Sequence, residues 1–141
     1  MTKIIAVTNQ KGGVEIEKGK NSVYEVLLGE INIKDAIYHS VVKTLDVLPS
    51  TVDLSGAEVD LVYVENREKV LKEALEQIKS NYDYIFIDCP PSLGLLTVNA
   101  LTATNSIIIP IQCEYFALVG LGQLMNTVRL IKKHLNPDVR S

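Results

Sequence analysis

Three short runs of apolar residues, each followed by polar or turn-forming residues, constrain the fold of this chain more than any other feature. They cover residues 4–7, 84–87 and 107–111. The runs are apolar throughout rather than at every second position, which is typical of strands that a parallel sheet buries on both faces. We therefore predict buried parallel strands at these positions, with residues 84–87 forming a central strand.

Segments with helical periodicity alternate with these strands. The clearest is residues 66–80, in which apolar side chains recur at helical spacing and opposite charges four residues apart form the solvent-facing side. Further helices are predicted at residues 22–29, 33–39, 93–103 and 117–135, and a further strand at residues 45–49. This alternation predicts an α/β fold of three layers, with a mostly parallel sheet and helices on both faces.

Length and charge narrow the class of protein. The chain has 141 residues, which predicts one domain spanning residues 1–141. Its formal net charge of −3 makes nonspecific DNA binding doubtful. No apolar run reaches the roughly 20 residues that cross a bilayer, so we expect no membrane association and a cytoplasmic protein. Cys89 and Cys113 lack the spacing of a zinc site or a disulfide framework and are expected to be reduced, buried thiols.

The residues after the first strand begin like a phosphate-binding loop. Gly12 and Gly13 follow the strand, and a strand, a glycine turn and a helix together can direct backbone N–H groups at a phosphate. The complete motif is G-x-x-x-x-G-K-[ST]. Here five residues rather than four separate Gly13 from Gly19, and Lys20 is followed by Asn21. Taken alone, the glycine pair is therefore more typical of a plain turn than of a phosphate site.

Asp88 is a stronger candidate for a functional residue. It comes directly after the apolar run of residues 84–87, and ligands of parallel α/β sheets bind beyond the carboxyl ends of the strands. A carboxylate in this position can reach the water shell of Mg²⁺. The alternative is structural: Asp88 ends the strand and helps to cap the following helix. Gly12 and Gln112 also follow predicted strands and are expected at the same edge.

Three stretches of the sequence resemble a known family. They are KIIAVTNQKGGV, SVYEVLLGEINIKDAI and YDYIFIDCPPSLGLLTVNALTATNSIIIPIQCEYFALVGLGQL, and they are similar to the ParA/Soj family of chromosome and plasmid partition ATPases. The resemblance covers nearly the whole chain, and the DCPPS and PIQCEYFAL stretches favour this family over the related MinD proteins. It implies a P-loop NTPase-like fold, ATP and Mg²⁺ as cofactors, an ATP-held dimer, DNA binding and a ParB-like partner.

The resemblance also implies roles for individual residues. Lys11 matches the family's signature lysine, which reaches the phosphates bound to the partner subunit, and Gly12 and Gly13 match the backbone of the phosphate loop. Asp88 matches the aspartate on the magnesium side. Pro90 begins the switch segment that follows it. The implied catalytic residues are therefore Lys11 and Asp88, the implied cofactor-binding residues are these two with Gly12, Gly13 and Pro90, and the implied metal ligand is Asp88.

The chain also departs from the family pattern. After Val14 the family continues with Gly-Lys-Thr-Thr, a long helix and a second strand, whereas here Val14 runs into EIEKGK, which resembles sequence well downstream. By the same resemblance we also expect the C-terminal part of the family fold to be absent. We therefore expect an internally deleted, incomplete P-loop domain with weak or lost ATP binding and hydrolysis. Loss of a strand and a helix should expose apolar surface or a sheet edge, which favours a dimer or larger assembly.

The resemblance leads to three hypotheses about function. The first is a DNA partitioning protein of the ATPase family with weakened nucleotide chemistry. The second is a non-enzymatic interaction protein that uses the predicted helices at residues 93–103 and 117–135 to bind a ParB-like protein or an intact paralogue. The third is a degenerate or engineered deletion product without a function of its own.

Overall fold

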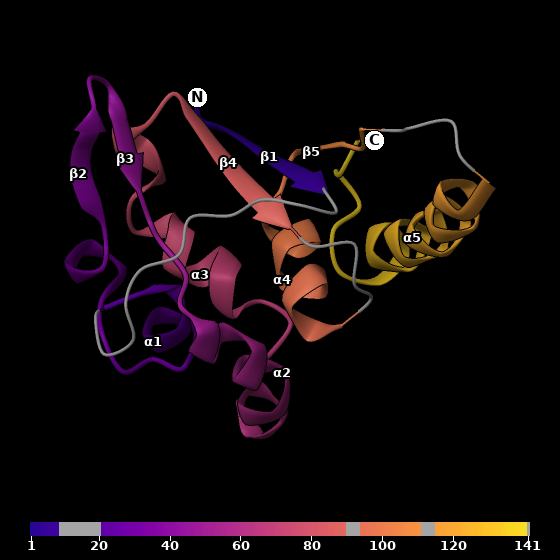
Figure 1. Ribbon diagram of the computed structural model, residues 1–141, viewed down its shortest axis with the longest axis horizontal. Coiled ribbons are helices and arrows are strands. Elements are labelled where there is room, and N and C mark those ends of the chain that lie inside the picture. Colours follow the sequence, from indigo (N-terminus) through magenta and orange to yellow (C-terminus); the bar gives the residue numbers. More distant parts are fainter. Residues whose placement is uncertain (9–20, 90–93, 111–114, 141) are drawn as a thin grey trace.

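A parallel sheet is the element against which the described helices pack. The computed structural model describes residues 1–8, 21–89, 94–110 and 115–140 (Figure 1). In this part of the chain, strands β1 (Lys3–Thr8), β4 (Tyr84–Cys89) and β5 (Ser106–Ile108) form one sheet in the order β4-β1-β5, with parallel pairing throughout. The predicted parallel sheet is thus confirmed. The prediction that residues 84–87 form a central strand is wrong, because β4 lies at the edge of the described sheet.

Five α-helices and several 3₁₀ turns are described. The α-helices are α1 (Val23–Leu27), α2 (Ala57–Asp60), α3 (Val70–Glu76), α4 (Leu95–Ala103) and α5 (Tyr115–His134). The 3₁₀ turns are η1 (Ile33–Asp35), η2 (Val52–Gly56), η3 (Leu61–Tyr63) and η4 (Lys79–Asn81). The turn and helix segments between residues 52 and 63 were not predicted, and α3 is shorter than the helix expected over residues 66–80.

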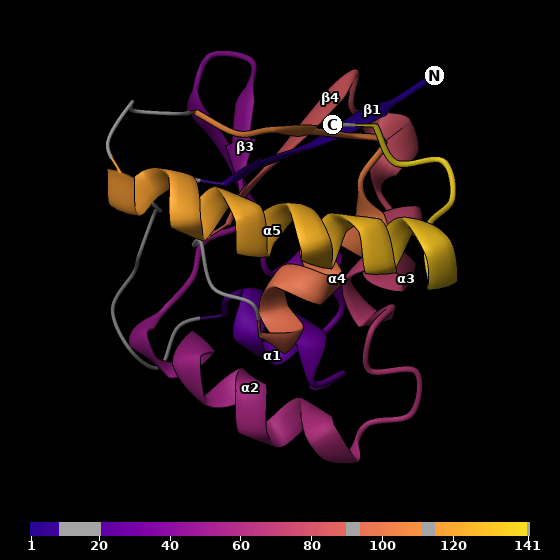
Figure 2. The ribbon, with the colours of Figure 1, turned by 90° about the vertical axis from the view of Figure 1, so that its right-hand side faces the viewer.

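Two apolar clusters pack the described helices against one face of the sheet. The first joins Ile4 and half-buried Ile85 to side chains of α1 and α3. The second joins Ala6, Cys89 and Ile107 to side chains of α4 and α5. Figure 2 accordingly shows the helices on one side of the strands. The α/β class is confirmed, and the second helical layer that we expected does not lie among the described residues.

Among the described residues, no helix covers the opposite face of the sheet. Side chains along β4 alternate, so that Tyr84, Phe86 and Asp88 are exposed while Cys89 and its apolar neighbours face the helices. Ile108 of β5 is exposed as well. An open apolar face of this kind is a candidate contact surface.

The first predicted helix begins and ends as the sequence indicates. The Ser22 hydroxyl accepts a hydrogen bond from the Tyr24 amide at 3.3 Å and donates to the Glu25 carboxylate, with oxygen–oxygen distances of 3.0 and 3.1 Å. A Ser with a Glu three residues later is the sequence signature of a helix start. Gly29 follows the helix with φ of 74°, a conformation that favours glycine. The predicted start and end of this helix are confirmed.

The prediction of a helix over residues 33–39 is wrong. One 3₁₀ turn, η1, is followed by strand β2 (Tyr38–Val42), which pairs antiparallel with β3 (Leu45–Val47). The chain reverses at residues 43–44, and Thr44 has positive φ. Ser40 also has positive φ and lies within β2, where the register with β3 is irregular. The Asp46 carboxylate accepts the Ser40 amide at 2.7 Å and so stabilises the hairpin. The strand predicted at residues 45–49 is present, but in this hairpin rather than in the parallel sheet.

A buried asparagine fastens the end of α5 to the end of α4. The side-chain amide of Asn136 donates hydrogen bonds to three carbonyl oxygens, those of Leu101 at 3.1 Å, Thr102 at 3.1 Å and Thr104 at 2.8 Å. These carbonyls lie at the C-terminal end of α4, where intrahelical partners run out. Asn136 therefore satisfies buried acceptors that water cannot reach.

We expect Asn136→Ala to lower the free energy of unfolding by about 1–3 kcal/mol, because the buried carbonyls of Thr102 and Thr104 lose this donor, whereas that of Leu101 keeps the Thr104 hydroxyl. Urea unfolding followed by circular dichroism would measure this change. Asn126→Ala is the matched control, since Asn126 is exposed on α5 and accepts only an exposed hydrogen bond from Arg129. Equal unfolding midpoints for the two variants would contradict the assigned role of Asn136.

Candidate functional site

The carboxyl ends of the three parallel strands meet at one edge of the sheet. Val7 lies opposite Asp88 on β4 and opposite Ile108 on β5, so the strands end nearly level with one another. Asp88 is exposed at this edge. The predicted site residue therefore lies where the chain leaves β1 toward the glycine pair.

Four other predicted site residues lie outside the described part of the chain. They are Lys11, Gly12, Gly13 and Pro90. Gln112, which we expected at the same end of the sheet, also lies outside the described residues. Within residues 1–8, 21–89, 94–110 and 115–140, no group of three or more potential metal ligands lies together. Asp88 is consequently the one predicted site residue whose place in the fold the structure gives.

Cys89 follows Asp88 in β4, but its side chain is buried in the second apolar cluster. Its thiol is buried, and burial together with the nearby Asp88 carboxylate raises the pKa of Cys89 to about 12. Thiolate is the reactive form of cysteine, so this thiol stays protonated and unreactive at neutral pH. The prediction of a reduced, buried thiol is confirmed for Cys89, whereas Cys113 lies outside the described residues.

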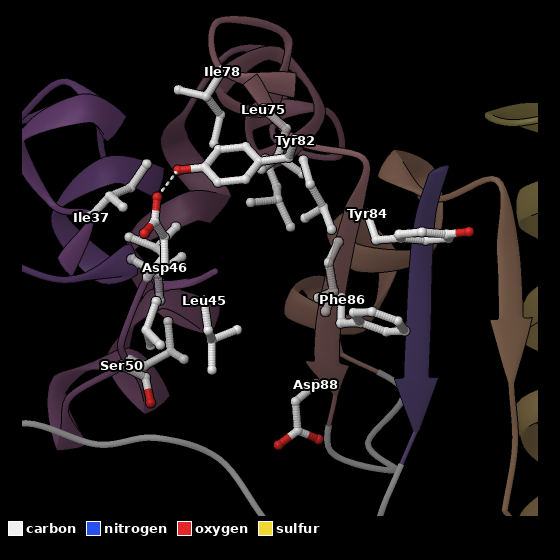
Figure 3. A pocket seen from close by; sticks show the side chains of 17 residues that line it. Ile37, Leu45, Asp46, Ser50, Leu75, Ile78, Tyr82, Tyr84, Phe86 and Asp88 are labelled. Atoms are coloured by element: carbon white, nitrogen blue, oxygen red, sulfur yellow. Dashed lines mark hydrogen bonds between the residues drawn. The ribbon is translucent and has the colours of Figure 1, made fainter. Parts of the chain in front are cut away.

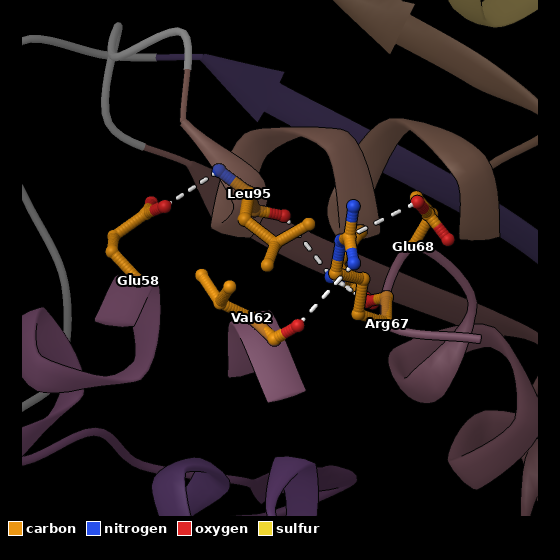
Figure 4. Close-up of polar contacts among 6 residues, drawn as sticks. Glu58, Val62, Arg67, Glu68 and Leu95 are labelled. Atoms are coloured by element: carbon orange, nitrogen blue, oxygen red, sulfur yellow. Dashed lines mark hydrogen bonds and ion pairs between the residues drawn. The ribbon is translucent and has the colours of Figure 1, made fainter. Parts of the chain in front are cut away.

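Helix α4 begins against a carboxylate that the sequence did not indicate (Figure 4). Glu58, from α2, accepts hydrogen bonds from the Leu95 amide at 2.6 Å and the Leu96 amide at 3.1 Å. A negative side chain at a helix N-terminus satisfies free amides and interacts favourably with the helix dipole. At these two amides the cap is Glu58 rather than Asp88, the residue named in the structural alternative.

Gly94 is needed because Glu58 lies so close. A Cβ atom at position 94 would overlap the Glu58 carboxylate. Glu58 is 36 residues before Gly94, so no local pattern relates the two. Gly94 falls within the helix predicted over residues 93–103, whereas in the structure it is the residue before α4 and makes no side-chain cap, so no signal in the sequence indicated this contact.

We expect Glu58→Gln to lower the free energy of unfolding by about 1–2 kcal/mol, because two charge-assisted hydrogen bonds become neutral ones. Chemical unfolding would measure the loss. Glu65→Gln, at an exposed position nearby, is the matched control and should be close to neutral. If both substitutions left stability unchanged, Glu58 would not stabilise the start of α4.

A groove of about 500 Å³ adjoins Asp88 along the outer side of β4 (Figure 3). Leu45, Asp46 and Val47 of β3 line one side, and β4 lines the other from Tyr84 to Asp88. Side chains of α3 and Ile78 form the floor. The groove thus runs between two strands that belong to different sheets.

Asp46 ties the hairpin to the main body beside this groove. Its carboxylate accepts the Tyr82 hydroxyl at 2.7 Å and lies 2.9 Å from Nδ1 of His39. Hydrogen bonds from the Ser40 amide and from Tyr82 are the main causes that lower the pKa of Asp46, with His39 contributing. Burial and the bond to Asp46 in turn raise the pKa of Tyr82 to about 12.

We expect stability to depend on pH through Asp46. Because its pKa is lowered in the folded protein, its contribution is present above about pH 4, the ordinary value for Asp, and is lost as the pH falls through the folded value. Asp46→Asn should therefore lower the melting temperature at pH 7 and differ less from the parent at pH 3. Asp83→Asn, at an exposed position, is the control. A difference that stayed constant from pH 7 to pH 3 would contradict this account.

Comparison with known proteins identifies the family. A family model described as an AAA domain matches residues 14–141. The sporulation initiation inhibitor protein Soj of Bacillus subtilis is 48% identical over 176 residues, which cover 99% of this chain and 70% of that protein. The chromosome partitioning protein ParA of Myxococcus xanthus is 49% identical over 128 residues, covering 91% of this chain. The chain belongs to the ParA/Soj family.

Solved structures agree with the fold of this ParA/Soj chain. A crystal structure of cobyrinic acid a,c-diamide synthase from Mycobacterium smegmatis, with bound ATP analog and magnesium, has a TM-score of 0.88 at 34% identity and covers 99% of this chain and 72% of its own. A putative plasmid partition protein from Borrelia burgdorferi B31 bound to AMPPNP has a TM-score of 0.82 at 25% identity, covering 94% of this chain and 70% of its own.

The relatives are longer than this chain. It spans 70% of Bacillus Soj and 45% of Myxococcus ParA. The Soj alignment also exceeds the chain itself, since it spans 176 residues and the chain has 141, so at least 35 aligned positions have no residue here. Within the described part of the chain, no helix is long and apolar enough to cross a membrane.

Proposed function

We propose that this chain is a DNA partitioning protein of the ParA/Soj family in which ATP binding and hydrolysis are weak or lost. One observation carries the proposal. The register of the β1–β4 pair places the end of β1 beside Asp88, and the chain leads from there to the glycine pair. The identity with Soj and ParA supports the partitioning role. By the same resemblance we propose a cytoplasmic protein of one domain.

The residues at the sheet edge fit Mg²⁺ that arrives with a nucleotide. Mg²⁺ is commonly held by one or two carboxylates together with substrate phosphates, and Asp88 is an exposed carboxylate at the edge where β1 also ends. Among the described residues, no group of three or more His, Cys, Asp or Glu side chains could hold a metal without such phosphates. Bound Mg²⁺ neutralises phosphate charge, and the role proposed for Asp88 is to orient its water shell.

Lys11, Gly12 and Gly13 are proposed to complete the site from the loop that follows β1. The glycine amides would contact phosphate oxygens, and Lys11 would reach the phosphates of a second subunit. The lysine and hydroxyl that follow in the complete motif have no counterpart at the right spacing. Such charge-assisted contacts contribute about 1.5–3 kcal/mol each. Their loss is the reason to expect weak binding.

Titration with a fluorescent ATP analogue, with and without Mg²⁺, tests this function. We expect weak, saturable binding that requires Mg²⁺ and that Asp88→Ala and Lys11→Ala each weaken about tenfold or more, because each removes a charge-assisted contact. Asp83→Ala, at the amino end of β4, is the matched control and should bind like the parent. Binding that persisted unchanged in the Asp88 and Lys11 variants would contradict the proposed site.

The open sheet face supports the second hypothesis, a non-enzymatic interaction protein that binds a ParB-like protein or an intact paralogue. Tyr84 and Phe86 are 57% and 63% exposed there. Helix α4 is largely buried, which leaves the outer side of α5 as the better helical surface. This hypothesis would replace the first if no saturable nucleotide binding were found while light scattering showed a dimer or larger assembly.

A further inference from the structure

Strand β4 has one unpaired edge. All six of its residues pair with β1 on one side, and within the described ranges no strand pairs with the other side. An unpaired edge presents a row of backbone N–H and C=O groups that another extended chain can join. The groove beside Asp88 lies against this edge.

A second strand faces this edge across the groove. β3 belongs to the separate hairpin, and both β3 and β4 line the same space. Figure 3 shows Leu45 and Phe86 on opposite sides of it. At one end of the space the Tyr82 hydroxyl, from just before β4, donates to the Asp46 carboxylate of β3 at 2.7 Å, so two side chains are enough to bridge it there. A space bordered by a strand on each side in this way suits one extended segment better than a folded domain.

The chemistry of the groove defines the segment that fits it. Leu71, Leu75 and Ile78 form an apolar floor, whereas Asp46 and Asp88 are the charged groups that line the space. An extended segment with aliphatic side chains toward the floor would bury this surface. Acidic residues near either carboxylate would be repelled. Main-chain hydrogen bonds to an edge together with side-chain pockets are the basis of strand addition between proteins.

Alignment with the relatives indicates which segment of the family sequence this chain lacks. Two relatives align over 128 residues, which equals 91% of this chain, so these alignments contain no long insertion. The family model likewise matches residues 14–141. The Soj alignment covers 99% of the chain and needs at least 35 extra positions. The extra residues therefore enter near residue 14, after β1. About 30 residues suffice for a strand with its crossover helix.

We propose that the groove between β3 and β4 accepts an extended strand in trans, supplied by the segment that a full-length Soj relative carries after its first strand. A second copy of this chain lacks the same segment and so cannot supply it. The added strand would pair with the free edge of β4 and join the hairpin to the parallel sheet. This inference does not depend on nucleotide binding.

Overlapping fluorescein-labelled peptides from the part of Bacillus Soj that is opposite the alignment gap provide the test, without nucleotide. We expect one peptide to show a rise in fluorescence anisotropy that saturates as the protein is added. The same peptide should slow the hydrogen exchange of the backbone amides at residues 84–89. Leu45→Asp, at a 49% exposed groove position, should weaken binding at least tenfold because it sets a charge against an apolar strand. Val41→Asp, 58% exposed on the same hairpin and outside the groove, should bind like the parent.

Several outcomes would overturn the proposal. They are the absence of a saturating peptide, equal binding of a peptide with scrambled sequence, and protection from exchange that appears outside β3 and β4. Slow exchange of residues 84–89 in the protein alone, rising with its concentration, would assign the groove to a second copy instead. Leu45→Ala is a milder variant that preserves the fold, and unchanged binding by both Leu45 variants would also count against the groove.

Discussion

The parallel pairing of β1 with β4 is the interaction on which the rest of the structure depends. It joins residues 3–8 to residues 84–89 along their whole length. One face of this pair receives both apolar clusters, and its carboxyl end positions Asp88 beside the exit toward the glycine pair. Its outer edge borders the groove. The apolar core, the candidate site and the proposed docking surface are therefore all built on the β1–β4 pair.

Much of this arrangement could be predicted from local patterns. Continuous apolar runs identified the parallel strands, and Ser22 with Glu25 identified the start of α1. Asp88 was expected just past the apolar run at residues 84–87, and it is the penultimate residue of β4, at the carboxyl end of that strand. These features are encoded within a few residues of one another, so the sequence alone is sufficient to predict them.

Features that depend on distant residues could not be predicted. The run at residues 84–87 has the composition of a strand buried on both faces, yet Phe86 is exposed and β4 is an edge. Among the described residues no strand pairs with the outer side of β4, and this long-range pairing is not encoded in the composition of the run itself. The helix predicted at residues 33–39 failed for a similar reason, since Asp46 stabilises a hairpin from outside the segment.

The contact between Glu58 and the start of α4 has a mechanical consequence. Glu58 holds the Leu95 and Leu96 amides, and these residues come shortly after Asp88 in the chain. The start of α4 can therefore move away from α2 only if both hydrogen bonds break. One carboxylate thus couples the positions of two helices that are far apart in the sequence.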